Sequence, residues 1–482
     1  MSRSKQIEIR NHADLKKQGL RKSNQQISRT DFQINSQYKL AEYANYKFFI
    51  RTYGCQANVI DTESMIKILI DLGFKRTHDI NDADLVILNT CAIRENAEKK
   101  VYGEIGLLAK NHHDQNKKFV LGVSGCMPQQ ESTVNMLMKN NYVNFAIGTH
   151  NIYELPEILF DVYTKNKKII SIHHETKHHF HKMPRRIDQM HKAFVSIMDG
   201  CNHFCTYCIV PFTRGQQISR EPEDIINEIN ELLASGVKEI TLIGQNVNDY
   251  GIDFIDKKYR FSDLLETVAN LPIKRIRFST SNPWNFDYKT IDVIAKHQNI
   301  MPCIHLPIQS GDNEILKQMK RFMLIDDYLK LINYMRSKIN NLAITTDLIV
   351  GFPNETEEQF ANTLKLYDLV QYDNAYTFIF SPREGTPAAL INDTVDLKTK
   401  QERLSRLNEL VKKYAKQNNE KYIGQTLEVL VDGPSKTDKN VLTGYSPQLK
   451  VVNFIGSANP GDLVQVKINQ ANRFSLLGEL VK

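Results

Sequence analysis

The chain has 482 residues, of which 41% are hydrophobic and 24% charged, with a formal net charge of +7 and seven cysteines. This composition is that of a globular protein of about three domains, and the absence of any run of 18 apolar residues excludes a membrane-spanning helix. An odd number of cysteines on a long chain argues against a disulfide framework, so we expect a cytoplasmic protein with reduced thiols or metal ligands.

Residues 1–46 form a polar, basic extension with nine Lys or Arg side chains against four acidic ones. They contain no apolar stretch of the kind that marks a secretory signal. We expect this segment to be disordered, and we favour a solvated extension over an arm that contacts phosphates.

The segment 47–165 opens with three strand–cysteine–helix units. Strand-like runs are followed by Cys55, Cys91 and Cys126, which lie 36 and 35 residues apart, about one βαβ step. Because ligands of open parallel sheets bind at the carboxyl ends of the strands, we expect an open parallel α/β domain. Its three cysteines should then form one shared site rather than three unrelated buried thiols.

Residues 166–191 are interpreted as a linker. Within it, HHETKHHFH at 173–181 contains five histidines, and such clusters can bind metal. Because this cluster lies between two domains and belongs to no other motif, we interpret it as a polar linker.

From 192 to 419 the chain alternates strand and helix patterns. Six apolar strand-like runs are separated by amphipathic helical stretches, which predicts a partial (β/α)6 barrel with its chemistry at the carboxyl ends of the strands. The runs are 193–198, 238–244, 274–280, 303–309, 342–351 and 374–381.

Cys201, Cys205 and Cys208 follow the first of these runs in the stretch CNHFCTYC. Zinc would need a fourth ligand, and His203 lies too close to Cys205 to complete a tetrahedron without strain. A cubane iron–sulfur cluster accepts three thiolates and leaves one iron open, so we favour this interpretation over zinc.

Such a triplet at the mouth of a partial barrel resembles the radical S-adenosylmethionine (SAM) superfamily. There the open iron binds the cofactor, whose reductive cleavage yields a 5′-deoxyadenosyl radical. The resemblance places Gly244, Gln245, Asn246 and Asp347 where such enzymes hold the nucleoside. Cys303 has no cysteine partner at ligand spacing and is expected to be an inert core thiol.

Residues 420–482 contain five short strand patterns separated by turn residues, which predicts a small antiparallel barrel. Barrels of this kind often bind oligonucleotides, but seven basic against six acidic side chains give no strong signal for RNA. On this test a structural cap is as well supported as an RNA-binding module.

Eight motifs together resemble the methylthiotransferase family, in order from residue 47 to the end. They are TYGCQAN (52–58), NTCAIRENAE (89–98), GCMPQ (125–129), CNHFCTYCIVPFTRG (201–215), LIGQNVNDYG (242–251), HLPIQSG (305–311), TTDLIVGFPNET (345–356) and YTFIFSPREGTPAA (376–389).

The resemblance implies a methylthiotransferase domain (47–165), a radical-SAM core (192–419) and a TRAM domain (420–482). It implies that Cys201, Cys205 and Cys208 ligate the radical-generating 4Fe–4S cluster. The other triplet, Cys55, Cys91 and Cys126, would ligate a second 4Fe–4S cluster that carries the sulfur to be transferred.

In such enzymes one SAM methylates the cluster-bound sulfur, and a second yields the radical that abstracts hydrogen from carbon 2 of an adenine. The implied substrate is isopentenyladenosine beside the anticodon of a tRNA stem-loop, where single-stranded bases can be splayed into a pocket. An electron donor of flavodoxin or ferredoxin type and a sulfur source are implied partners, and we expect a monomer.

Residues after the first two cysteines bear on the substrate. Gln56 follows Cys55, and the stretch AIREN, which begins at Ala92, follows Cys91. By resemblance to the family, both favour isopentenyladenosine as the substrate. The alternatives are sister enzymes that act on threonylcarbamoyl-adenosine in tRNA or on a ribosomal-protein aspartate. From a different class, a non-catalytic iron–sulfur or zinc protein that binds RNA also stays open.

Some residues depart from the family pattern, namely Ala57, Pro128, Gln216, Gln217 and Asn282. None of these differences removes a cysteine of either triplet. Because the loop after Cys208 departs from the family pattern, we assign no role to its charged residues from the resemblance. Arg214 and Arg383 are each as well explained by contacts to cofactor or RNA phosphates as by a structural role.

Overall fold

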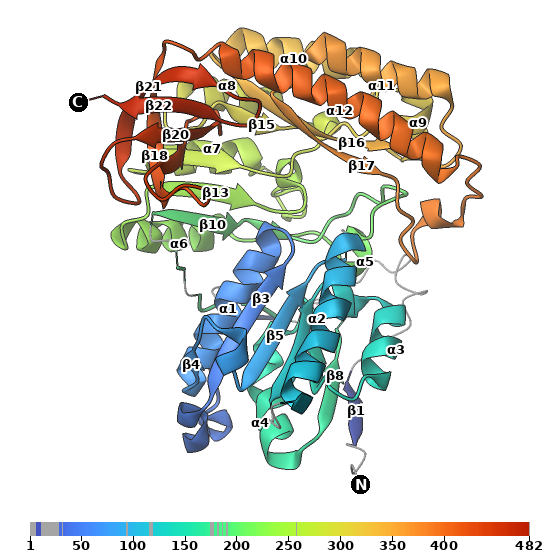
Figure 1. The fold of residues 1–482 in the computed structure, drawn as a ribbon, viewed down its shortest axis with the longest axis vertical. Helices are drawn as coiled ribbons and strands as arrows, with labels where there is room; N and C mark the ends of the chain where they lie inside the picture. Colours follow the sequence, from blue (N-terminus) through green and yellow to red (C-terminus); the bar gives the residue numbers. More distant parts are fainter. Residues whose placement is uncertain are drawn as a thin grey trace.

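The computed structural model describes residues 6–10, 28–30, 32–92, 95–114, 119–173, 178–180, 183–185, 187–188, 191–256 and 258–481. Three regions follow one another along the chain: a parallel sheet covered by helices, an incomplete barrel of strands and helices, and a small closed barrel (Figure 1). In this view the first region lies below the other two. The α/β fold class predicted from the sequence is confirmed.

The first region is built on a seven-stranded sheet in which all neighbouring strands are parallel. Across the sheet the strands are β1 (Ile7–Arg10), β8 (Lys168–Ser171), β7 (Phe145–Ile147), β6 (Val120–Gly125), β5 (Leu85–Thr90), β3 (Lys47–Tyr53) and β4 (Lys75–Arg76). Every residue of β5 is buried, as expected for a parallel strand covered on both faces.

Helices cover both faces of this sheet. Because successive strand residues point to opposite faces, Leu85 and Ile87 of β5 join one core, whereas Val86 and Leu88 join the other. The first core lies under α1 (Gln56–Leu72) and α4 (Leu155–Lys165), and the second under α2 (Glu95–Asp114) and α3 (Glu131–Lys139).

The extension 1–46 is not disordered throughout, contrary to expectation. Strand β1 pairs with β8 at the edge of the sheet, and Arg10 forms an ion pair with Asp161 of α4 at 2.6 Å. Residues 32–46 contain two 3₁₀ turns, and Tyr43 is fully buried beneath α1. Residues 1–5, 11–27 and 31 lie outside the described part.

The first sheet extends into the segment 166–191, which was expected to be a linker. The first residues of this segment contain β8, whose buried run Lys168–Ser171 pairs with β7 and therefore completes the sheet. Of the histidine-rich segment, residues 174–177 and 181 lie outside the described part, while β9 (His178–Phe180) pairs with β2 (Ser28–Thr30).

The second region holds two three-stranded parallel sheets, joined through a parallel bridge between Ile276 and Ile300. Their strands are β10 (Lys192–Ser196), β13 (Glu239–Ile243) and β14 (Arg275–Phe278), then β15 (Cys303–His305), β16 (Ala343–Val350) and β17 (Asn374–Ile379). One apolar core runs through both sheets and their helices. The helices are α6 (Pro222–Ala234), α7 (Phe261–Ala269), α8 (Tyr288–Lys296), α9 (Asn313–Gln318), α10 (Ile325–Lys338) and α11 (Glu357–Val370).

The long helix α12 (Leu397–Glu420) packs on this core and leads to the closed barrel. Buried Arg275 of β14 fixes that barrel to the core, because its guanidinium donates to the Tyr445 carbonyl at 2.7 Å and pairs with Glu428 at 2.9 Å. The barrel strands are β18 (Thr426–Pro434), β19 (Leu442–Tyr445), β20 (Val451–Ile455), β21 (Leu463–Ala471) and β22 (Leu476–Leu480).

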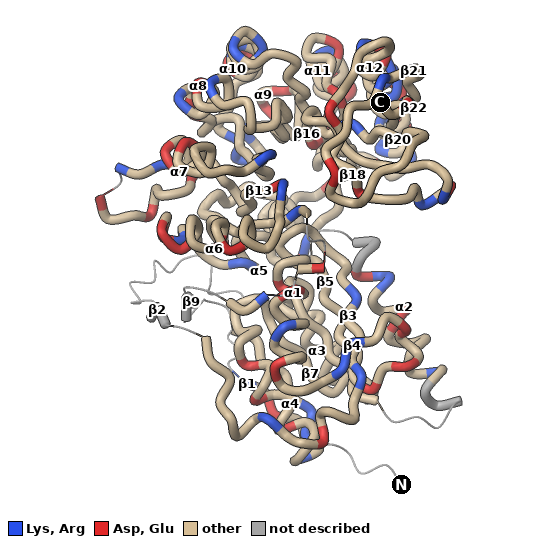
Figure 2. Tube along the Cα trace, turned by 90° about the vertical axis from the view of Figure 1, so that its left-hand side faces the viewer, with Lys and Arg blue, Asp and Glu red and all other residues tan. Residues whose placement is uncertain are grey.

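Basic and acidic residues are intermingled over the regions drawn, rather than separated into two poles (Figure 2). In the part of the chain that the structure describes, no helix combines the length and the apolar character needed to cross a membrane.

Candidate functional site

Cys55, Cys91 and Cys126 follow three adjacent strands of the first sheet. The chain runs from β3 through α1 to β4 on one side and then returns to β5 on the other, so the strand order reverses at β3. The last residues of β3, β5 and β6 are paired side by side, and each cysteine comes one or two residues later. A reversal of this kind opens a crevice at the carboxyl ends of the strands. The structure therefore brings the three cysteines to one edge of the sheet.

Two buried asparagines hold this edge together. Asn58, in the first turn of α1, accepts a hydrogen bond from the Cys55 backbone N–H at 3.3 Å and donates to the side-chain oxygen of Asn89 at 3.1 Å. Asn89 donates in return to the Asn58 carbonyl at 2.8 Å and to the Thr62 hydroxyl at 2.9 Å. Because buried amides need such partners, this network fixes the Cys55 loop against the strand that leads to Cys91.

Gly125 brings Cys126 close to the neighbouring strand. Its φ is +98°, and a Cβ at this position would collide with the Thr90 carbonyl, so only glycine fits without strain. The Cys126 N–H then donates to that carbonyl at 2.9 Å. Burial raises the pKa of the Cys126 thiol, with Arg214 opposing the shift.

Cys201, Cys205 and Cys208 lie in the loop between β11 (Met198–Asp199) and the short helix α5 (Val210–Thr213). The Cys208 N–H donates to the Cys205 carbonyl at 2.9 Å, which bends the loop back on itself. Burial raises the pKa of Cys201 and that of Cys208 to about 12. A metal or cluster bound here would displace those thiol protons.

His203, the alternative fourth ligand in this loop, is engaged elsewhere. Its Nε2 pairs with Asp249 Oδ2 at 2.5 Å, and Asn285 donates to the other oxygen of that carboxylate at 2.7 Å. Asp249 is buried and follows β13. The imidazole is therefore held toward the second strand of the barrel rather than left available to the thiols.

Arg321 is a site residue that the sequence did not indicate. Arg321 is buried, and its Nη1 lies 3.9 Å from Cys205 Sγ. The guanidinium carbon lies 4.5 Å from the centroid of the Trp284 ring, over which it stacks. The same Nη1 donates to the Tyr207 hydroxyl at 3.2 Å. Because Arg321 is 116 residues from Cys205 and belongs to none of the motifs, only the fold reveals this contact.

Gly244, Gln245 and Asn246 come directly after β13, at the same end of the barrel as the cysteine loop. A Cβ on Gly244 would collide with Met198, which precedes that loop. Asn246 is fully buried, yet both polar atoms of its side chain lack a hydrogen-bond partner. Such an unsatisfied buried amide is costly unless a ligand completes its hydrogen bonds, so this segment fits a bound cofactor.

Asp347 lies within β16 rather than past the end of that strand. Residues at even positions, such as Leu348, join the core shared with the helices, so the alternation of the strand turns Asp347 toward the barrel interior. His305 Nε2 lies 3.4 Å from Asp347 Oδ1. On β17, Tyr376 and Phe378 face the same interior and are 54% and 41% exposed, so the interior is open and partly aromatic.

At the contact between the first two regions, one cysteine triplet lies next to the chain segment that follows the other. Cys126 packs against Ile209, which directly follows Cys208. Thr149 of the first region donates to the Thr213 carbonyl of the second at 2.9 Å.

Both arginines left open by the sequence lie at this contact. Arg214 donates from Nε to Cys126 Sγ at 3.3 Å and from Nη2 to Asp61 of α1 at 2.7 Å. Arg383 Nη1 lies 3.6 Å from Glu98 Oε2 of α2. Each arginine therefore reaches from the second region to the first.

The donor set at this contact suits iron–sulfur clusters. Three thiols lie at each of two positions, and a cubane bound by three thiolates keeps one iron open. Within the described ranges, no three His, Cys, Asp or Glu side chains are placed to hold a single metal ion. The assignment of the six cysteines as cluster ligands stays a prediction.

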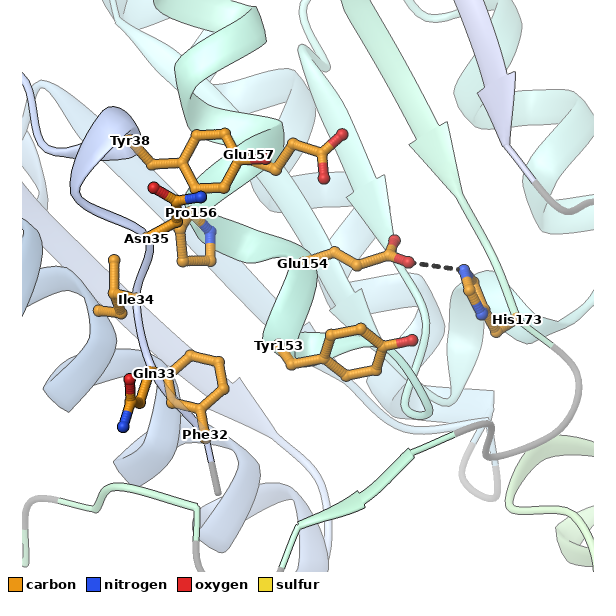
Figure 3. Close-up of a pocket in the computed structure, with 10 residues that line it drawn as sticks. All are labelled: Phe32, Gln33, Ile34, Asn35, Tyr38, Tyr153, Glu154, Pro156, Glu157 and His173. Carbon is orange, nitrogen blue, oxygen red and sulfur yellow. Dashed lines mark ion pairs between the residues drawn. The ribbon is translucent and has the colours of Figure 1, made fainter. Parts of the chain in front are cut away.

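A separate cavity of about 380 Å³ lies near the carboxyl end of β8 (Figure 3). Phe32 and Tyr38 line one side, and Tyr153 and Glu154 the other. Glu154 pairs with buried His173 at 2.8 Å. Burial alone would raise the pKa of Glu154, but hydrogen bonds from His173 and neighbouring polar groups lower it overall. This cavity contains none of the six cysteines.

Three protein families match successive parts of the chain. They are the uncharacterized protein family UPF0004 at residues 47–148, the Radical SAM superfamily at 195–367 and the TRAM domain at 420–481. The three regions of the fold thus correspond to three family matches.

Similar proteins span nearly the whole chain. The chain is 49% identical over 469 residues to the tRNA-2-methylthio-N(6)-dimethylallyladenosine synthase of Malacoplasma penetrans, covering 96% of this chain and 95% of the relative. To the protein of the same description from Bacillus subtilis it is 48% identical over 454 residues, covering 94% and 89%. Among solved structures, the radical S-adenosylmethionine methyltransferase TsrM from Kitasatospora setae has a TM-score of 0.51 at 13% identity, covering 72% of this chain and 75% of that chain. This last likeness concerns the fold alone.

Proposed function

The chain belongs to the tRNA-2-methylthio-N(6)-dimethylallyladenosine synthase family and is a radical-SAM transferase; on that premise we propose how its own residues serve the reaction. The substrate is N(6)-dimethylallyladenosine, also called isopentenyladenosine, beside the anticodon of tRNA, and the product is its 2-methylthio derivative. SAM and 4Fe–4S clusters supply the methyl group, the electron and the 5′-deoxyadenosyl radical. Relatives at 48–49% identity favour this substrate over those of the sister enzymes.

The observation that carries the proposal is the pair of cysteine triplets at one interface. Replacing a C–H bond by a C–S bond requires both hydrogen abstraction and delivery of sulfur. Two clusters, each with an open iron, can divide these tasks between them. The contact of Cys126 with Ile209, next to Cys208 in the chain, supports two sites that act on one substrate.

In the barrel, Cys201, Cys205 and Cys208 would hold the radical-generating cluster. Gly244, Gln245 and Asn246 would hold the cofactor, with the unsatisfied amide of Asn246 pairing with its polar atoms. Asp347, facing the interior beside His305, is the fourth proposed cofactor contact. The pairing of His203 with Asp249 would keep the cysteine loop in place against β13.

In the first region, Cys55, Cys91 and Cys126 would hold the second cluster at the strand-order reversal. Asn58 and Asn89 would keep their loops at fixed separation, since both amides are buried and paired with each other. Preorganised ligands of this kind bind a cluster without reordering the chain.

The substrate adenosine would enter the open barrel interior. Tyr376 and Phe378 present exposed aromatic rings there, and unstacked bases in single-stranded RNA commonly stack on such rings. The TRAM barrel, which Arg275 fixes to β14, would contact the rest of the anticodon stem-loop.

The reaction also needs partners that bring electrons and sulfur. We propose a small electron carrier of flavodoxin or ferredoxin type and a separate sulfur donor, with the chain working as a cytoplasmic monomer on tRNA.

Mass spectrometry of tRNA nucleosides tests this function. In cells that lack the gene, the 2-methylthio derivative of isopentenyladenosine should disappear and isopentenyladenosine should accumulate. The wild-type gene and Cys303→Ala should restore the product, whereas Cys205→Ala should not. Because Cys303 lies apart from both triplets, Cys303→Ala is the matched cysteine control.

Two other outcomes would redirect the proposal. A loss confined to 2-methylthio-threonylcarbamoyl-adenosine would assign the chain to that sister reaction. Unchanged tRNA nucleosides in the deletion strain would contradict tRNA methylthiolation and point to a ribosomal-protein substrate or a non-catalytic role.

A further inference from the structure

Arg214 connects the cysteine loop of the barrel to the other triplet. Its Nε donates to Cys126 Sγ at 3.3 Å, and its Nη2 donates to Asp61 Oδ2 at 2.7 Å. Only 7% of the arginine side chain and 13% of the Asp61 side chain are exposed. A guanidinium presents its donors in a fixed planar fork, so these two contacts together determine where its charge lies.

The turn that carries Arg214 also supports the local triplet. The Arg214 N–H donates to the Val210 carbonyl at 2.8 Å, and the next carbonyl, that of Gly215, accepts from the Cys201 N–H at 3.1 Å. Gln216, the residue after Gly215, lies so close to Gly200 that a Cβ on Gly200 would collide with the Gln216 backbone. One short stretch of chain therefore contacts both cysteine sites.

The electrostatic surroundings favour a permanently charged guanidinium. An arginine side chain stays protonated in folded proteins, and Arg214 also pairs with the Asp61 carboxylate at 2.7 Å. Hydrogen bonds from charged donors to a thiolate are stronger than neutral ones, and hydrogen bonds to the sulfurs of a cluster help to set its reduction potential.

We propose that Arg214, oriented by Asp61, is a positioning residue that fixes the second cluster against the radical site and raises the reduction potential of that cluster. The inference rests on the proposed function, because it requires a cluster on Cys55, Cys91 and Cys126. An arginine that merely joined two domains would contribute to stability without changing the properties of the cluster.

The test measures the second cluster alone. In the full-length chain carrying Cys201→Ala, Cys205→Ala and Cys208→Ala, redox titration followed by electron paramagnetic resonance reports on the remaining cluster. Arg214→Met should shift its midpoint potential to more negative values, because the reduced form loses a neighbouring positive charge. Iron release to a chelator should be about 10-fold faster, as for other lost partners of metal ligands.

Matched variants separate positioning from stability. Arg220→Met removes a partly buried arginine of the barrel, with 11% of its side chain exposed and a pair to Glu228 at 2.6 Å, and it should leave the midpoint potential unchanged. Arg214→Gln, which keeps an N–H donor but loses the positive charge, should shift the potential in the same direction as Arg214→Met, and Arg214→Lys should lie between Arg214→Met and wild type. Asp61→Asn should speed iron release, because Arg214 loses the partner that orients it at 2.7 Å.

The outcomes distinguish this inference from the proposed function. If the chain without the radical triplet binds no 4Fe–4S cluster, the two-cluster function fails. If it binds one and the potential is the same in Arg214→Met, Arg214→Gln and Arg220→Met, the role of Arg214 is refuted. Should Arg214→Met fail to fold, Arg214→Gln decides: a shift to more negative values supports the role, and an unchanged potential overturns it.

Discussion

The two cysteine triplets are built in opposite ways. Cys201, Cys205 and Cys208 come from one loop of eight residues, whereas the other three thiols come from three strand ends spread over 72 residues. The first triplet depends on local backbone geometry, such as the hydrogen bond that bends Cys208 toward Cys205. The second depends on the whole parallel sheet and on its buried asparagines.

This difference has a functional consequence. A local triplet can keep its spacing while the surrounding domain moves, but an assembled triplet is only as rigid as the strands that carry it. The assembled triplet is also the one that Arg214 contacts from the other region. We therefore expect the two sites to respond differently to substitution.

Cys205→Ala should have the largest effect. It removes the middle thiol of the local triplet, so SAM cleavage and methylthiolation should both fall to background. Release of 5′-deoxyadenosine and formation of the modified nucleoside measure the two activities. Retained cleavage at the wild-type rate would show that this loop does not hold the radical-generating cluster.

Cys91→Ala should divide the activities. The local triplet stays intact, so 5′-deoxyadenosine should still form, while the methylthio product should vanish with the second cluster. Iron content should fall by about one cluster per chain. Product formation by this variant would contradict the division of labour between the sites.

Asn89→Ala should weaken only the assembled triplet. The substitution removes the two hydrogen bonds that join Asn89 to Asn58, whose side-chain amide nitrogen keeps its bond to the Thr90 carbonyl at 3.2 Å. The loss of a buried hydrogen-bond partner costs about 1–3 kcal/mol. We expect a lower midpoint of thermal unfolding and partial loss of the second cluster, measured as iron and as product, with 5′-deoxyadenosine formation retained.

Asn151→Ala provides the matched control for Asn89→Ala. Asn151 is equally buried in the same region and bonds to Ser171 at 3.0–3.1 Å, away from the cysteines. It should lower stability without loss of iron. If both variants lost iron equally, the network would act through general stability alone.

The same contrast explains what could be predicted from the sequence. Alternating strand and helix patterns indicated the barrel, and the strand–cysteine–helix repeat correctly placed three cysteines at neighbouring strand ends. Both inferences use short-range periodicity together with a general rule for parallel sheets. The function inferred from the motifs agrees with the relatives.

Contacts between segments that are distant in the sequence could not be predicted from these local patterns. Arg214 meets Cys126 across 88 residues, and Arg321 meets Cys205 across 116. Strand β1 joins the sheet beside β8, although it lies in a segment whose charge indicated disorder. In each case the partner is chosen by tertiary packing, which no local pattern encodes.

Asp347 shows that a strand predicted with nearly correct bounds does not by itself tell which way its side chains point. The run predicted at 342–351 contains Asp347, and β16 spans Ala343–Val350. Because side chains alternate along a strand, the position of Asp347 inside β16 turns it toward His305 and the barrel interior.

Cys303 belongs to neither triplet, so its substitution should have the smallest effect on SAM cleavage and methylthiolation. It is buried near Met301, Ala343 and Leu449, and burial raises the pKa of its thiol from 9.0 to about 12. We expect Cys303→Ala to retain both activities. In the folded chain at pH 8, Cys303 should resist alkylation by iodoacetamide, as measured by peptide mass spectrometry, and react once the chain is unfolded.

The pKa of Cys303 also predicts a pH dependence of stability. In the unfolded chain the thiol ionises near 9, whereas in the folded chain it stays protonated until about 12. The unfolded state therefore loses its proton first, and this thiol lowers the free energy of unfolding as pH rises from about 9 to 12. Between pH 8 and pH 10 the wild type should lose about 1 kcal/mol more than Cys303→Ala, measured by urea unfolding of the two proteins. An equal loss in both would mean that Cys303 ionises in the folded chain as readily as in the unfolded one, and rapid alkylation at pH 8 would lead to the same conclusion.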